Sequence, residues 1–162
     1  MRKQKGFSLI ELLIVVAIIL IIAAIAIPNL LRSRIAANEA SAVGSIRTIN
    51  TAEVTYSSTY PDVGFSADLA SLGSGSGACT ATSTQACLLD SVLANATSST
   101  TSKSGYYFTY TVVAGTPATA YTVLGDPATV GQTGQRHFFS DASGVIRYDP
   151  SAVASATSNP LQ

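Results

Sequence analysis

The feature that most constrains this chain is an apolar segment close to its start. Residues 12–27 (LLIVVAIILIIAAIAI) are sixteen apolar residues in a row, and between Phe7 and Ile27 only Ser8 and Glu11 break the apolar character. As an α-helix, residues 7–27 span about 31 Å at roughly 1.5 Å per residue, which matches the hydrocarbon thickness of a bilayer. Apolar side chains lie all round this helix, so it is not an amphipathic surface helix.

Positive charge is distributed unevenly about this segment. Arg2, Lys3 and Lys5 precede it, and the first positive residue after Ile27 is Arg32. Clustered Lys and Arg favour the cytoplasmic side of a membrane. The sequence therefore predicts a single-pass segment with a cytoplasmic N-terminus and the bulk of the chain outside.

Three interpretations of the segment remain open at this point. A secretory signal peptide would end at a small-x-small site, which Ala24-Ile25-Ala26 supplies, and the mature protein would start near Ile27. An uncleaved anchor, as in a membrane-anchored sensor, fits the length. Neither explains Glu11, because an ionisable group costs about 2.5–3.5 kcal/mol at the centre of a membrane, though less near its edge. Such a group indicates a function.

The residues around Glu11 form a pattern with fixed spacing, and this pattern is the basis of the third interpretation. A basic stretch ends in Gly6, the aromatic Phe7 follows, and Glu11 stands four positions later at the start of the apolar run. The segment KGFSLIELLIVVAIILIIAAIAIP thereby resembles the N-terminus of type IV prepilins and of the related pseudopilins of type II secretion systems. Pro28 falls where many pilins have a helix-kinking proline. The resemblance covers the first part of the chain, and the rest matches the family only in layout.

The resemblance implies how this N-terminus is processed. A prepilin peptidase would cut between Gly6 and Phe7, release residues 1–6 as a leader, and N-methylate Phe7. Loss of the leader leaves six positive and nine negative side chains, a net charge of −3. In a filament, the Glu11 carboxylate would pair with the Phe7 amine of a neighbouring subunit. Removing the partner of a buried charge costs about 3–5 kcal/mol, so this pair would set the register.

The resemblance also implies a structural function rather than an enzymatic one. The chain is expected to be a subunit of a type IV pilus serving adhesion or surface motility, and the alternative is a pseudopilin of a type II secretion filament. The expected partners are further copies of the chain, the prepilin peptidase, an assembly ATPase and an inner-membrane platform. The subunit would wait in the bacterial inner membrane and end in an extracellular pilus. That the chain is a secreted soluble protein or a membrane-anchored sensor is a less favoured hypothesis.

The helical pattern continues beyond the apolar segment. Pro28 predicts a kink or local melting near residues 24–28, because proline lacks the N–H and clashes with the preceding turn. One continuous face follows, although Glu39 and Glu53 interrupt it, and Pro61 ends the run. The face consists of Ile35, Ala42, Ile46, Ile49, Tyr56 and Tyr60. The prediction is one helix over residues 7–60, of which 7–27 lie in the membrane or the filament core.

Residues 61–104 are expected to form a loop with helical turns near 67–72 and 88–93. The Gly-Ser run 73–77 lacks the Lys-Ser/Thr of a phosphate loop and reads as a flexible linker. Cys79 and Cys87 lie outside the cytoplasm in the expected topology, so we predict a structural disulfide. The hydroxyl-rich stretch 97–102 reads as a solvated loop and is a chemically suitable acceptor for glycosylation.

The remaining residues carry strand signals. Residues 106–113, 120–124, 136–139 and 145–148 are rich in β-branched and aromatic side chains, and Asp141–Gly144 is a hairpin turn between the last two. The expected fold is α+β and pilin-like: a long N-terminal helix packed on an antiparallel meander of about four strands over residues 105–150. The tail 151–162 is small and polar and is expected to fray.

Composition limits the chemistry of this head. The chain has one His, two Cys and no net charge, which excludes multi-histidine and four-thiolate metal sites and leaves no basic patch for nucleic acid. We expect no catalytic group, metal or cofactor, and treat His137 as a surface histidine. Asp126, Asp141 and Asp149 have no calcium-loop spacing.

Overall fold

A computed structural model describes residues 7–75 and 78–161 of the chain. The leader 1–6 and part of the Gly-Ser run, residues 76 and 77, lie outside the described residues. The chain divides into two compact units, residues 1–34 and 35–162, which are taken separately below.

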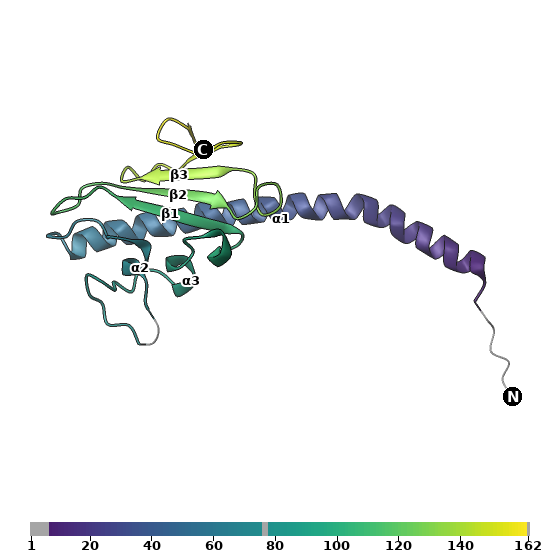
Figure 1. Ribbon diagram of the computed structural model, residues 1–162, viewed down its shortest axis with the longest axis horizontal. Helices are drawn as coiled ribbons and strands as arrows, with labels where there is room; N and C mark the ends of the chain where they lie inside the picture. The colour runs from purple at the N-terminus through teal and green to yellow at the C-terminus, as the bar shows by residue number, and fades with distance from the viewer. Residues whose placement is uncertain (1–6, 76–77, 162) are drawn as a thin grey trace. The chain divides into compact units, whose positions relative to one another are not determined.

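One helix, α1 (Leu9–Thr59), runs through both units (Figure 1). It confirms the prediction of a single long helix. Pro28 lies inside α1 and the helix is continuous through it, so the expected local melting at residues 24–28 is wrong. Ala26 and Leu30, two positions to either side of Pro28, have high helix propensity and support the helix past one missing N–H. A kink at Pro28 stays a prediction.

Short helical elements follow α1 where turns were predicted. The helix α2 (Leu69–Leu72) begins after Asp68, whose carboxylate accepts from the Ser71 N–H, and α3 (Ser91–Ala94) begins after Asp90 in the same way. The 3-10 turn η1 (Ser99–Thr101) lies within the hydroxyl-rich stretch. Both carboxylates satisfy N–H groups that the first turn of a helix leaves without partners.

The sheet is an antiparallel meander with strands in sequence order. Its members are β1 (Tyr106–Val112), β2 (Tyr121–Pro127), β3 (His137–Asp141), β4 (Arg147–Asp149) and β5 (Asn159–Pro160). The first four confirm the expected strands. The turn between β3 and β4 is closed by the Gly144 N–H, which donates to the Asp141 carbonyl at 2.9 Å.

The fifth strand was not expected. Asn159 and Pro160 pair with β4, and the Leu161 N–H donates to the Ile146 carbonyl at 2.8 Å. The prediction that the tail frays is therefore wrong for this part of the chain. The reason is burial: Ala154 and Leu161 pack against the head even though the surrounding residues are small and polar.

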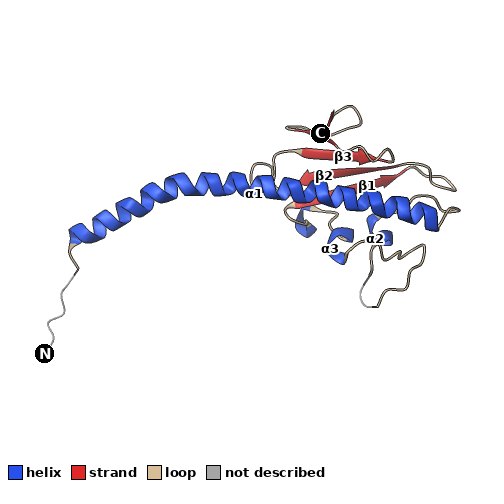
Figure 2. Cartoon of the chain, turned by 180° about the vertical axis from the view of Figure 1, so that it is seen from behind, coloured by secondary structure: helices blue, strands red, loops and turns tan. Residues whose placement is uncertain are grey.

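Part of α1 packs against one face of the sheet (Figure 2) and supplies six of the nineteen buried residues of the core. Ile46 and Ile49 are fully buried, as are Phe108 and Phe138 on the sheet. Gly125 in β2 allows this approach, because a Cβ there would lie 3.2 Å from Ile46 Cδ1 and 3.3 Å from Phe108 Cε1. Leu72 of α2 and Leu93 of α3 complete the core beside the helix.

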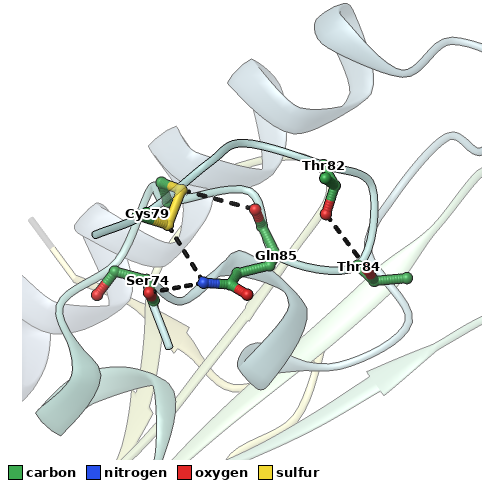
Figure 3. Close-up of a disulfide and its surroundings, with 6 residues drawn as sticks. Ser74, Cys79, Thr82, Thr84 and Gln85 are labelled. Atoms are coloured by element: carbon green, nitrogen blue, oxygen red, sulfur yellow. Dashed lines mark hydrogen bonds between the residues drawn. A yellow bond between two sulfur atoms is a disulfide. The ribbon is translucent and has the colours of Figure 1, made fainter. Parts of the chain in front are cut away.

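The predicted disulfide joins Cys79 and Cys87, with the two Cα atoms 6.1 Å apart (Figure 3). Gln85 lies between them, and its side-chain amide donates to the Ser74 carbonyl at 2.8 Å and to Cys79 Sγ at 3.4 Å. The loop is fixed to the head where the Leu88 N–H donates to the Leu72 carbonyl at 2.8 Å. The cross-link therefore organises a long irregular loop that has few apolar residues of its own.

Burial of α1 in the head gives a first prediction. Ile46→Ala should lower the free energy of unfolding of the head by about 2–5 kcal/mol, because Ile46 is fully buried and the substitution leaves a cavity. The measurement is denaturant unfolding of the full chain in detergent. Val54→Ala on the same helix, where the side chain is 62% exposed, is the control and should change stability by less than about 0.5 kcal/mol. Equal losses in both variants would contradict the packing described here.

Candidate assembly segment

The start of α1 is defined by Ser8 and Glu11. The Glu11 carboxylate accepts from the Ser8 backbone N–H through Oε2 at 2.8 Å, and the first helical hydrogen bond joins the Leu12 N–H to the Ser8 carbonyl at 3.2 Å. This is the glutamate half of a capping box, in which the acidic residue at the third helical position bonds back to the residue before the helix. Its negative charge also lies at the positive end of the helix dipole.

This capping role was not predicted, although Ser8-Leu9-Ile10-Glu11 has the Ser-x-x-Glu signature of a capping box. One oxygen, Oε2, makes the cap. The other, Oε1, has no hydrogen-bond partner within residues 7–75 and 78–161. The carboxylate can therefore cap its own helix and still accept a hydrogen bond from another molecule.

Phe7, the predicted site of cleavage and methylation, precedes the helix. Its side chain is 80% exposed. Gly6 lies outside the described residues, so the structure brings Phe7 and Glu11 to the helix start but does not include the predicted cleavage site as a whole.

The first half of α1 presents an uncovered apolar surface. Within the described residues, α1 is the helix that is long and apolar enough to cross a membrane, and its first half provides the apolar residues. Its large side chains are all more than two-fifths exposed, from Leu9 at 77% to Leu31 at 41%. Soluble monomers rarely leave such an extended apolar surface open, so this surface requires lipid or protein around it.

One face of this half contains a shallow hollow of about 390 Å³. The spacing of its lining residues repeats every three or four positions, which is the spacing of side-chain ridges on a helix. The lining residues are Leu9, Leu12, Leu13, Val16, Ala17 and Leu20. A groove between such ridges accepts the ridge of a second helix.

In the second unit, the two glutamates that interrupt the apolar face of α1 are buried and satisfied. Glu39 accepts from the backbone N–H groups of Gln135 and Arg136, both at 3.0 Å, and from Arg136 Nε at 2.7 Å. Burial alone would raise the pKa of Glu39, but these hydrogen bonds and the charge of Arg136 together lower it below its ordinary value. Glu39 therefore fixes the start of β3 to α1.

Glu53 makes a second attachment of the same kind. It is fully buried and accepts from the Ser66 N–H at 3.1 Å and the Ser66 hydroxyl at 2.5 Å. The Tyr110 hydroxyl donates to the Ser66 carbonyl at 3.0 Å, and burial raises the pKa of Tyr110. The charge thus holds the segment after α1 against the helix.

His137 and the three aspartates have roles other than those considered from the sequence. The expectation of a surface histidine is wrong, because the His137 side chain is only 13% exposed and its Nδ1 lies 2.6 Å from Asp126 Oδ1. Asp141 accepts from the Ser143 N–H and Asp149 from the Ser151 N–H, so both stabilise turns. Within the described residues, no three His, Cys, Asp or Glu side chains gather as metal ligands would.

Comparison with known proteins places the N-terminal segment in a class. Residues 1–27 match the family described as the prokaryotic N-terminal methylation motif. This match confirms that the N-terminal segment resembles that of type IV prepilins.

Two individual relatives agree with this class. The chain is 67% identical over 39 residues to the type IV wide pilus major component PilA4 of Thermus thermophilus, covering 24% of this chain and 30% of the relative. It is 43% identical over 54 residues to the type IV major pilin protein PilA of Myxococcus xanthus, covering 33% of this chain and 24% of the relative. The similarity thus spans less than a third of the length of either relative. No solved structure matches the chain significantly.

The environment of Glu39 predicts a pH dependence. Its pKa in the folded state is below the ordinary value of 4.5, so the ionised carboxylate stabilises the fold at neutral pH. As the pH falls below 4.5, Glu39 becomes protonated in the unfolded state first, and the contribution decreases. It is lost completely once the pH is below the lowered pKa, where Glu39 is protonated in the folded state as well. Urea unfolding of the full chain in detergent should show stability falling over this range.

The matched variants isolate the group responsible. Glu39→Gln should be less stable than wild type at neutral pH and should lose part of the acid-induced fall. Asp62→Asn removes an exposed carboxylate with no partner in the described segments and should leave the fall unchanged. If Glu39→Gln retained the wild-type pH dependence, the ion pair would not be its source.

Proposed function

We propose that this chain is the precursor of a structural subunit of a type IV pilus. The proposal is carried by one observation: the N-terminal methylation motif occurs together with a helix whose apolar surface is uncovered on all sides. A packed head follows that helix in the chain. The role is mechanical, and no catalytic step is assigned to the head.

Processing is the first step of this function. Prepilin peptidase would cleave between Gly6 and Phe7 and methylate the new amine of Phe7. Glycine before the cut lets the backbone enter a narrow site without a side chain. Removal of Arg2, Lys3 and Lys5 then leaves the Phe7 amine as the charged group at the end of the chain.

Before assembly, the subunit would wait in the bacterial inner membrane as a single-pass protein with its N-terminus in the cytoplasm. Support comes from the basic leader, from the length of the apolar segment and from the absence of buried side chains in the most apolar part of that segment. The head would lie outside the cytoplasm, where the Cys79–Cys87 disulfide can form.

Assembly would exchange lipid for the α1 helices of other subunits. Lipid tails are as apolar as leucine, so this exchange gains little from burial and depends on packing and polar pairing. The groove at Leu9–Leu20 supplies packing, and the Glu11 carboxylate supplies pairing with the Phe7 amine of a neighbour. An assembly ATPase would supply the energy for moving the subunit out of the membrane, and an inner-membrane platform would be the place where it joins the filament.

Intact mass spectrometry of the protein purified from a sheared surface fraction tests the processing. The expected product begins at Phe7 and carries one N-methyl group, because the peptidase acts between Gly6 and Phe7. A chain that begins at Met1 or near Ile27 would refute the proposal. Microscopy of the same fraction separates a surface pilus from a secretion filament confined to the periplasm.

Glu11→Gln tests the pairing without disturbing the cap. Glutamine also accepts the Ser8 N–H in a capping box, so the helix start is kept while the charge is lost. We expect normal amounts of the variant in the membrane and at least about a tenfold loss of filaments, since a buried amine would lack its partner. Ser8→Ala, which keeps the backbone N–H, is the control and should assemble. Wild-type filament yield from Glu11→Gln would show that the charge is not used.

A further inference from the structure

Almost every charged side chain of the head has an ion-pair or hydrogen-bond partner within residues 35–75 and 78–161. Among the basic side chains of residues 35–75 and 78–161, Lys103 lies 3.5 Å from Asp90 and Arg136 lies 2.7 Å from Glu39. Arg147 donates through Nη1 to the Ser158 carbonyl at 3.1 Å. Arg47 is the exception in these residues, because its exposed guanidinium contacts no acceptor there.

The acidic side chains of the same residues show the same pattern. Seven of them accept hydrogen bonds within the head, namely Glu39, Glu53, Asp68, Asp90, Asp126, Asp141 and Asp149. Asp62 is exposed and has no such partner in the described head. Arg47 and Asp62 are therefore the charged side chains of the described head that have neither a hydrogen-bond nor an ion-pair partner there, whereas Glu53, Asp68, Asp141 and Asp149 lack a cation but are hydrogen-bonded.

The surroundings of these two residues are complementary. Arg47 lies at the edge of a hollow of about 300 Å³ whose other lining residues are Gly144, Val145, Ile146 and Leu161. The hollow thus offers one cation in a mixed surface, to which Val145, Ile146 and Leu161 contribute apolar groups. Asp62 stands in the turn after α1 between the exposed Pro61 and Val63, the latter 39% exposed. This turn presents one anion between apolar side chains.

The two residues cannot pair within one molecule. From Arg47 to the end of α1 at Thr59 the helix advances about 18 Å, at roughly 1.5 Å per residue, and the turn carrying Asp62 lies beyond that end. This separation exceeds the reach of an arginine and an aspartate side chain. Any pairing of Arg47 with Asp62 therefore joins two copies of the chain.

We propose that the Asp62 turn of one subunit docks into the Arg47 hollow of the next, with an offset of about 20 Å along α1. The contact uses different surfaces on the two copies, so it is heterologous and repeats without closing, as a filament requires. The proposal rests on the proposed function as a filament subunit. It adds a contact between heads, separate from the apolar segment and from Glu11.

Charge reversal in the full chain tests the contact. Arg47→Glu and Asp62→Arg should each lower the filament protein recovered by shearing by about tenfold, because each places like charges together. The double variant, which exchanges the charges, should recover to within about twofold of wild type, as coupled residues do. Thr109→Glu adds a negative charge at an exposed position of β1 and should assemble normally.

Cross-linking tests whether the pair lies between molecules. Chains with Arg47→Cys and chains with Asp62→Cys, expressed together, should give a disulfide-linked dimer in filaments. Either variant alone should give much less. Membrane levels of each variant and an intact Cys79–Cys87 disulfide verify that the head has folded.

The outcomes separate this contact from the filament itself. Wild type without filaments would overturn both the proposed function and the contact. Wild-type filaments together with unaffected single reversals would overturn the contact alone. Single reversals that fail and are not rescued by the exchange, or co-expressed cysteine chains that do not cross-link, would also overturn it.

Discussion

The helix α1 has to meet two different demands with one continuous backbone. Over residues 12–27 its side chains are apolar on every side and uncovered, and from residue 35 onward the same helix supplies one layer of a packed core. An α-helix can do both because its backbone hydrogen bonds are internal, whether lipid, water or protein surrounds it. The head depends on α1, because the helix covers the apolar face of the sheet.

Few charges are present, and the head uses them as points of attachment. Glu39 and Glu53 would be costly on the core side of α1 if they were unpaired, yet each accepts several hydrogen bonds from another segment: Glu39 from residues before β3, and Glu53 from Ser66 after α1. Such buried groups tolerate only one arrangement of the loops, whereas apolar contacts tolerate several. The two glutamates thus fix where β3 begins and where the chain turns after α1.

The sequence was sufficient for the main elements but not for the long-range polar contacts. Uniform apolar character revealed the first half of α1, and β-branched and aromatic runs revealed β1 to β4. The partners of Glu39 lie 96 and 97 residues away, so the sequence showed the charge but not the amide groups that satisfy it. His137 was misjudged for a similar reason, because the hairpin of β2 and β3 places it beside Asp126, one step past the Gly125–Phe138 pair. The cap at Glu11 is different: its signature was present in Ser8-Leu9-Ile10-Glu11 and was overlooked.

The small fifth strand has a consequence for crowding. An open sheet edge is a template on which identical chains can add strands and aggregate. Beyond β4 the sheet continues for only two residues, and one of them, Pro160, has no N–H to offer. This border of the sheet is too short and too poor in donors to recruit another strand. Many copies of the head can therefore be held at high local concentration while uncontrolled amyloid-like growth from this edge is suppressed.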